Sequence, residues 1–290
     1  MHNVILSVLG TSQDAGLPQP NCYCNNCVKA IKDPTFRRTA ASLAIVFPNE
    51  RTWHLIDATP DLKDQMIQLQ HTFELQGKTM SSIFLSHAHM GHYPGLIFLG
   101  KEAMNVSQMP VYAGEKMKTL LENHAPWQQL TDLENIVVHE VRPDQLTAIS
   151  QEVTIKTIDV PHRNEFSETF GFWIIGPSKK VLYIPDIDRW EDWHVDLYET
   201  CQEADICLLD ATFFSTKELA HIGRNFKDIP HPPITETMDR LQALVTSGQT
   251  DVYFTHFNHS NPVIDPASQE RHILEARGFK IAEEGMSFEL

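Results

Sequence analysis

Residues 87–92 read His-Ala-His-Met-Gly-His, and this stretch constrains the fold of the chain more than any other. It follows an apolar, strand-like run, Ser82–Ser86, and precedes Tyr93–Leu96, which resembles the start of a helix. Alternate residues of an extended segment point the same way, so His87 and His89 can reach one metal ion, while His92 at the turn is aimed at a second position. Three unrelated surface histidines are the alternative in a chain with 15 histidines.

Three later apolar runs each end in a residue that could bind metal. Residues 154–161 alternate like a strand and end at His162, residues 180–185 end at Asp186, and residues 251–255 end at His256. Singly, each could be an ordinary turn or cap residue. Together with the first strand they predict ligands that converge at the carboxyl ends of strands.

These elements resemble the signature of the metallo-β-lactamase superfamily. That family carries a strand-terminal HxHxDH motif, then a His, an Asp and a His on later strands, and an early strand ending in Asp, here residues 53–58 with Asp57. The order and kind of the elements match over the whole chain. The resemblance implies an αββα sandwich, in which two sheets pack face to face with helices outside.

Two regions resemble the pyrroloquinoline-quinone biosynthesis B family and the phosphodiesterase family of the carbon–phosphorus lyase pathway more closely. Residues 9–19 and the Cys-x-Cys-x-x-Cys of residues 22–27 look like the opening of both families. Residues 256–262 and 284–287 resemble the quinone-biosynthesis family in particular. These motifs are more specific for the fold than for the reaction.

The resemblance implies a metal site whose ligand set departs from the family at one position. His87, His89 and His162 form the first position, with Asp186 able to bridge, and His92, His256 and Asp186 form the second. Gly91 stands where the family has an aspartate ligand. We therefore expect one strongly bound ion and a second that binds weakly or not at all. Three ligands plus water suit a catalytic zinc, and two imidazoles with a carboxylate also suit iron, so Zn²⁺, Mn²⁺ and Fe²⁺ stay open.

The cysteines form a second constellation. Cys22, Cys24 and Cys27 are spaced poorly for mutual disulfides but well for thiolates around one structural zinc. The phosphodiesterase resemblance implies His259 as the fourth ligand. A loop of free cysteines is the alternative. Cys201 and Cys207 are interpreted as buried core thiols.

A further histidine is a candidate catalytic group. Residues 210–214 and 230–235 look like the region where ribonuclease Z and related phosphodiesterases place a histidine near the scissile bond. His231 is therefore a candidate proton donor or anion-orienting group, and a helix-capping or loop histidine is the alternative. The phosphodiesterase has a further histidine where this chain has Phe213, which argues against a cyclic phosphate as substrate.

Composition limits the partners of the chain. A formal net charge of −15 argues against nucleic acid or an anionic membrane as a standing partner. No apolar run approaches the length of a membrane span, and residues 4–9 look like a first strand rather than a signal sequence. The cysteine pattern is not that of a secreted disulfide scaffold. We expect a cytoplasmic protein with a small-molecule or short-peptide substrate, and nothing in the sequence indicates an oligomeric state.

A single domain over residues 1–290 is expected, without repeats. The predicted strands in the first half are Val4–Leu9, Ser42–Phe47, His54–Asp57, Ile83–Ser86 and Val111–Ala113. The predicted helices are Leu62–Leu69, Leu96–Met104, Glu115–His124, Glu191–Glu199, Thr235–Ser247 and Pro266–Arg277.

The first hypothesis for the function is a metal-dependent hydrolase, in which a metal-activated water attacks an ester, lactone or phosphodiester and Asp186 bridges the metals or orients the water. The second is an enzyme of pyrroloquinoline-quinone-type cofactor biosynthesis that uses iron to oxidise a peptide-derived tyrosine. The third is a non-catalytic metal-binding or carrier protein that has lost its second metal with Gly91.

Overall fold

Two seven-stranded mixed sheets form the centre of the computed structural model, which describes residues 4–78, 80–221 and 230–290. The first sheet has the order β14-β1-β2-β3-β4-β5-β6 and the second has the order β13-β12-β11-β10-β9-β8-β7. Along the first order three antiparallel pairings are followed by three parallel ones. Along the second order three parallel pairings are followed by three antiparallel ones. The strands of the first sheet are β1 (Ile5–Gly10), β2 (Ser42–Phe47), β3 (Thr52–Ile56), β4 (Ser82–Phe84), β5 (Met109–Ala113), β6 (Ile136–Glu140) and β14 (Ser287–Glu289). Those of the second are β7 (Leu146–Ala148), β8 (Thr154–Asp159), β9 (Phe170–Ile175), β10 (Lys180–Ile184), β11 (Ile206–Asp210), β12 (Asp251–Thr255) and β13 (Lys280–Ile281).

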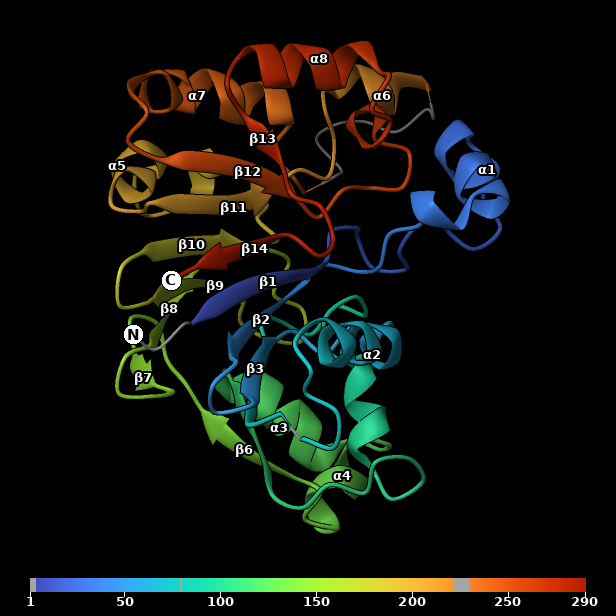
Figure 1. The fold of residues 1–290 in the computed structure, drawn as a ribbon, viewed down its shortest axis with the longest axis vertical. Coiled ribbons are helices and arrows are strands. Elements are labelled where there is room, and N and C mark those ends of the chain that lie inside the picture. Colours follow the sequence, from blue (N-terminus) through green and yellow to red (C-terminus); the bar gives the residue numbers. More distant parts are fainter. Residues whose placement is uncertain (1–3, 79, 222–229) are drawn as a thin grey trace.

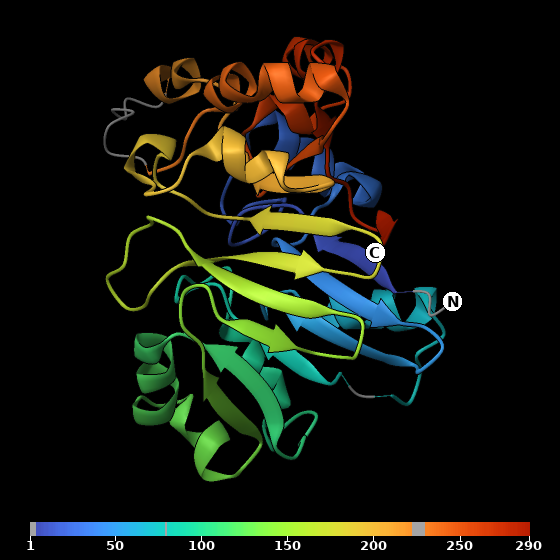
Figure 2. The same ribbon diagram turned by 90° about the vertical axis from the view of Figure 1, so that its left-hand side faces the viewer.

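Helices cover the outer face of each sheet (Figures 1 and 2). The helices on the first sheet are α2 (Leu62–Thr72), α3 (Glu115–Asn123) and α4 (Gln128–Asp132). The helices on the side of the second sheet are α5 (Leu197–Gln202), α6 (Thr216–His221), α7 (Ile234–Ser247) and α8 (Gln269–Ala276). One helix, α1 (Asn25–Lys32), stands at the side of the sandwich (Figure 1). The predicted αββα architecture is confirmed.

Three apolar cores follow from this layering. One lies between the sheets, where Phe84 of β4 meets Phe172 of β9 edge to face at 6.3 Å between ring centroids. The other two lie between each sheet and its helices. Because both faces of the sheets are covered, a strand such as β2 reads as one apolar run, and all of its residues are buried. Among the described residues, no helix is long and apolar enough to cross a membrane.

Two predicted helices are wrong. Residues 96–104 do not form an α-helix; a 3₁₀-helix spans Pro94–Leu99 instead. Its Gly95 lies so close to the carbonyl oxygen of Thr59 that a Cβ would sit 2.2 Å from it, so packing fixes this segment. Residues 191–199 are divided between a 3₁₀-helix, Trp190–Asp192, and α5.

Local hydrogen bonds explain why residues 191–199 do not form one helix and why α8 begins later than predicted. The indole of Trp193 donates to the carbonyl oxygen of Asp159, and Asp196 then caps the start of α5 by accepting from the Glu199 amide. Helix α8 begins at Gln269 rather than at Pro266, because Ser268 is its N-cap and accepts from the Arg271 amide. Several elements were not predicted at all, and among them α1 matters most because it carries Cys27.

Candidate metal centre

The candidate ligands come together where strands of both sheets end. His87, His89 and His92 follow β4 of the first sheet, while His162, Asp186 and His256 follow β8, β10 and β12 of the second. Ligand atoms of His87, His89 and His162 lie within 4.8 Å of one another, as do those of His87, His92 and Asp186. We call these six residues the buried centre. Sequence spacing predicted this convergence, and the structure brings all six together.

Asp186 is the common neighbour of the histidines. Its Oδ2 lies 3.0 Å from Nε2 of His92, 3.2 Å from Nε2 of His256 and 3.4 Å from Nε2 of His87. Its Oδ1 lies 3.6 Å from Nε2 of His162. Ligand atoms about 2.0–2.2 Å from a shared ion are separated by about 3.4 Å at tetrahedral angles and about 3.0 Å at right angles. The observed separations are those of ligand atoms around a shared ion.

Several nitrogen and oxygen atoms around Asp186 have no hydrogen-bond partner among the described residues. Within the described part of the chain, Nε2 of His87, His92 and His256 and Oδ1 of Asp186 are buried and make no hydrogen bond. Buried polar atoms without a partner are costly and call for an explanation. Because these four belong to side chains that bind divalent ions, the donor set fits a metal ion.

Each of four imidazoles is held through its other nitrogen. Nδ1 of His92 lies 2.8 Å from Asp57, that of His162 lies 2.7 Å from Asp188, that of His87 lies 2.9 Å from Ser86, and that of His256 lies 3.2 Å from Thr212. Such contacts fix the ring orientation and turn Nε2 toward the centre. Nε2 of His162 lies 3.1 Å from Nδ1 of His89. Sequence reasoning did not assign a role to these partners, although Asp57, like the ligands, follows a strand end.

Burial sets the protonation of most of these rings. It lowers the pKa of His87 far below its usual range and that of His89 to about 4, so both are neutral at pH 7. His92 differs, because the Asp57 carboxylate outweighs the burial and raises the pKa. Burial would raise the pKa of Asp186, but the surrounding histidines, His256 first, hold it well below its usual range.

His231 lies beside this centre and is fixed by a carboxylate. Its Nδ1 lies 2.6 Å from Oδ2 of Asp210 and 3.4 Å from Oδ1 of Asp186. Asp210 also accepts from the Ile187 amide and from the amide and hydroxyl of Thr212. Because the oxygens of Asp210 are already occupied, this carboxylate positions His231. Burial opposes protonation of His231, but Asp210 outweighs it and raises the pKa.

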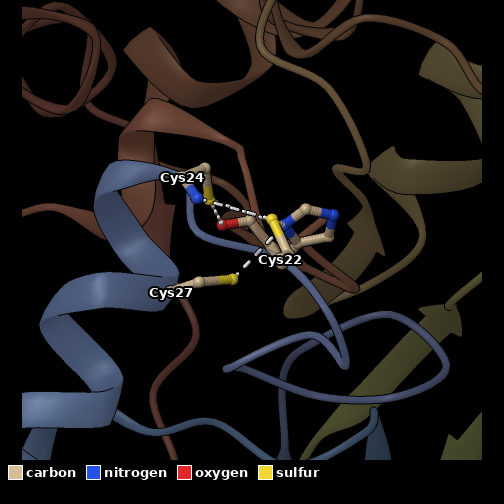
Figure 3. Close-up of side chains that lie close together, drawn as sticks. Cys22, Cys24 and Cys27 are labelled. Carbon is tan, nitrogen blue, oxygen red and sulfur yellow. Dashed lines mark hydrogen bonds between the residues drawn. The ribbon is translucent and has the colours of Figure 1, made fainter.

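The cysteine cluster is a separate site formed by Cys22, Cys24, Cys27 and His259. Cys22 precedes α1, Cys24 is its N-cap and Cys27 is in its first turn, and their sulfur atoms point toward one another (Figure 3). The three Sγ atoms lie 3.5, 3.6 and 3.5 Å from Nδ1 of His259. A tetrahedral zinc with Zn–S about 2.3 Å and Zn–N about 2.05 Å separates sulfur from nitrogen by about 3.6 Å.

Backbone and side-chain contacts hold the cluster in place. The amides of Cys24 and Gln19 donate to Sγ of Cys22 and Cys27, respectively. The Asn26 side chain donates to the carbonyl oxygen of His259. All five cysteines of the chain are free, and Cys201 and Cys207 are buried as expected. The predicted residues are thus gathered with the spacing that a closed zinc site requires.

Gly91 and Phe213 mark the departures from the family pattern. Gly91 does not have a positive φ, but a Cβ on it would lie 2.7 Å from Cα of Asp14, so the N-terminal loop occupies the space of a side chain. The ring of Phe213 lies 6.2 Å from that of His231. A phenylalanine therefore borders the candidate catalytic histidine.

A protein-family model and two relatives of known name match most of this chain. A protein-family model, described as "Beta-lactamase superfamily domain", matches residues 52–257. "Coenzyme PQQ synthesis protein B" of Nitrosococcus oceani is 27% identical over 316 residues, covering 98% of this chain and 99% of the relative. The protein of the same name from Rhizobium meliloti is 27% identical over 308 residues, covering 98% and 97%.

Solved structures share the fold over the same length. Zn(2+)-bound PqqB from Methylobacterium extorquens has a TM-score of 0.81 at 22% identity and covers 99% of this chain and 100% of its own. A diphosphatase from the PhnP family has a TM-score of 0.70 at 21% identity and covers 99% and 97%. At these identities the likeness shows the fold alone.

Proposed function

The chain belongs to the β-lactamase superfamily, and we propose that it is a metal-dependent hydrolase whose substrate is an ester, a lactone or a phosphodiester. The observation that carries this proposal is the set of buried, unpartnered atoms around Asp186, to which three imidazoles turn Nε2 within 3.4 Å. His87, His89, His162 and Asp186 hold the first ion, and His92, His256 and Asp186 offer a second position. Zinc, manganese and iron all suit such ligands.

A bound divalent ion polarises the scissile group and lowers the pKa of water toward neutrality. The residues of the chain supply the remaining functions. Asp186 orients the attacking water through Oδ1, which has no hydrogen-bond partner among the described residues. His231 donates a proton to the leaving oxygen, and Asp210 fixes the ring for this transfer by its contact with Nδ1.

A cavity beside the centre supports a small-molecule or short-peptide substrate. It has a volume of about 410 Å³ and lies between α3 and residues 165–168. Glu165, which lines it, has Oε2 at 3.7 Å from Nε2 of His89. Small-molecule sites typically occupy about 300–1,000 Å³, so this open depression has room for a compact ligand, and the contact of Glu165 with His89 links it to the centre.

The test compares hydrolysis by the wild type with that by His231→Asn, using protein reconstituted in turn with Zn²⁺, Mn²⁺ and Fe²⁺. An aryl ester, a lactone and bis(4-nitrophenyl) phosphate serve as substrates. We expect His231→Asn to lower kcat by about 10²–10⁴-fold at unchanged metal content. His139→Asn, at an exposed position on β6, is the control. The proposal fails if the fully loaded wild type hydrolyses none of the three classes.

A second candidate function rests on a different observation. The curated relatives named "Coenzyme PQQ synthesis protein B" match this chain over 98% of its length, which supports a role in quinone-type cofactor biosynthesis. In this proposal the centre holds iron and the substrate is a tyrosine-containing peptide, oxidised at the expense of dioxygen. Dioxygen uptake by the Fe²⁺-loaded protein, dependent on the peptide and absent with Zn²⁺, would favour this function over hydrolysis.

A further inference from the structure

Asp14 lies against Gly91, the position at which the family motif has an aspartate. A Cβ built on Gly91 would sit 2.6 Å from Oδ1 of Asp14. Within an aspartate, Cβ is itself about 2.4 Å from each carboxylate oxygen, from standard bond lengths and angles. Oδ1 of Asp14 thus lies about as far from the Cβ position of residue 91 as the carboxylate oxygens of an aspartate at that position would lie.

The backbone of Asp14 explains why position 91 is a glycine. Cα of Asp14 lies 2.7 Å from the Cβ position of Gly91, closer than real Cβ atoms approach another atom, and its amide nitrogen lies 3.1 Å away. The φ of Gly91 is not positive, so conformational freedom is not what selects glycine there. Close approach of the N-terminal loop selects it instead.

The loop that carries Asp14 is tied to the segment that carries His256. The Gln13 amide donates to the carbonyl oxygen of Phe257 at 2.9 Å, and the Phe257 amide donates to that of Thr11 at 2.8 Å. Asp14 itself has a φ of 30°, an unfavourable value for a residue with a side chain. These bonds therefore hold Asp14 in a strained conformation directly beside two ligands of the second metal position.

The carboxylate of Asp14 is available for binding. Among residues 4–78, 80–221 and 230–290 it has no hydrogen-bond or ion-pair partner, and Asp14 is exposed beside the buried Gly91. Other carboxylates near the centre are engaged: Asp57 accepts from Ser86 and His92, and Asp210 accepts from Thr212 and His231. A second dication close to the first needs additional negative charge, because the repulsion between the ions is large.

We propose that Asp14 supplies the carboxylate of the second metal position, in place of the side chain that Gly91 lacks. The inference rests on the proposed metal-dependent function and makes His92, His256, Asp186 and Asp14 the ligand set of that position. A loop far away in sequence thereby restores the charge of the family motif. It also replaces the expectation, drawn from Gly91 alone, that the second ion binds weakly.

The test is a Mn²⁺ titration of the full chain after its cysteine cluster has been filled with Zn²⁺, with free and spin-coupled Mn²⁺ followed by electron paramagnetic resonance. We expect the wild type to bind two Mn²⁺ and to show a coupled pair. Asp14→Asn keeps the shape of the side chain and removes its charge, so we expect the second Mn²⁺ to bind at least tenfold more weakly and the coupled signal to be lost. Asp64→Asn, an exposed carboxylate on α2, is the matched control.

Two further measurements separate a ligand from a structural residue. The melting temperature of metal-free Asp14→Asn should equal that of the wild type, and Asp14→Glu should recover part of the second-site affinity. Equal Mn²⁺ binding by the wild type and Asp14→Asn, whether one ion or two, would overturn the role of Asp14 and leave the proposed function standing. A wild type that binds no Mn²⁺, Zn²⁺ or Fe²⁺ at the buried centre would overturn both.

Discussion

The cysteine cluster and the buried centre share one short segment, residues 256–259, but the chain assembles them in different ways. Three of the four residues of the cluster come from residues 22–27, and only His259 is distant in sequence. The centre takes its ligands from the ends of β4, β8, β10 and β12, so no short segment contains it. A local motif thus forms the first site, and the pairing of two sheets forms the second.

The surroundings of the two sites differ as well. Cys22, Cys24 and His259 are half-buried, and the cluster supplies the four side chains that a closed tetrahedral zinc site needs. The ligands of the centre are almost all buried, and carboxylates or hydroxyls hold Nδ1 of four of the five imidazoles. A cluster that is closed and locally formed suits a structural ion, whereas a centre with oriented ligands and unpartnered atoms suits a reactive one.

The largest effect is expected from replacing Asp186, which should remove metal from the buried centre but not from the cysteine cluster. Asp186→Asn removes the carboxylate that lies beside histidines of both metal positions, so we expect metal affinity at the centre to fall by more than about 100-fold and hydrolysis to be lost with it. The zinc of the cysteine cluster should remain. Elemental analysis of the purified variant, beside activity, checks both expectations, and loss of the zinc as well would show that the substitution damages more than the centre.

The next effect concerns the cluster itself. Cys24→Ser should remove one equivalent of zinc and lower the melting temperature by about 10 °C, because structural zinc contributes directly to folding free energy. Tyr23→Ser, an exposed residue of the same loop, is the control and should keep its zinc. Unchanged zinc stoichiometry in Cys24→Ser would contradict the assignment.

Residues 256–259, which both sites share, allow Cys24→Ser to test whether the two sites are coupled. The carbonyl oxygen of His259 accepts from Asn26, and the Asn258 amide donates to Thr212, whose hydroxyl lies 3.2 Å from Nδ1 of His256. Loss of the zinc should therefore also loosen His256. A fall in stability without any change in metal affinity at the buried centre would show that the segment does not transmit the disturbance.

A smaller effect is expected from a residue that holds a ligand. Asp57→Asn weakens the contact to Nδ1 of His92, and asparagine tolerates the φ of 66° at this position. We expect metal affinity at the second position to fall by about 10–100-fold while the first position changes little. Metal titration of the variant checks this, and equal loss at both positions would indicate general damage to the site.

The smallest expected difference between the two sites is in how their metal affinity depends on pH. Burial raises the pKa of the Cys27 thiol to about 12, so zinc must displace a proton to bind the cluster, and its affinity should rise with pH. Burial lowers the pKa of His87 far below its usual range and that of His89 to about 4, so no proton leaves these rings when the first ion binds between pH 6 and 8. Calorimetric titration in buffers of different ionisation enthalpy counts the protons released. Equal release at both sites would contradict the comparison.

The cysteine motif and the strand-terminal ligands could be predicted from the sequence because short-range geometry determines them. The spacing of Cys22, Cys24 and Cys27 places three thiols on one loop and one helical turn, and the alternation of β8 and β12 places His162 and His256 after strand ends. Strand β2 was predicted with its observed limits, since burial on both faces makes Leu43–Phe47 a continuous apolar run. The family resemblance supplied the layered fold from the order of these elements.

Only the tertiary structure decided which groups meet across the sheets. The contacts of Asp57 with His92, of Asp188 with His162 and of Asp210 with His231 join segments whose positions no periodicity relates. The same holds for Asp14, which reaches Gly91 because its loop pairs with Phe257. The sequence determined the ligand types and the strands that carry them, because burial and spacing act along the chain. Orientation, charge balance and the filling of the space at position 91 arise from packing between distant segments, which a linear pattern does not encode.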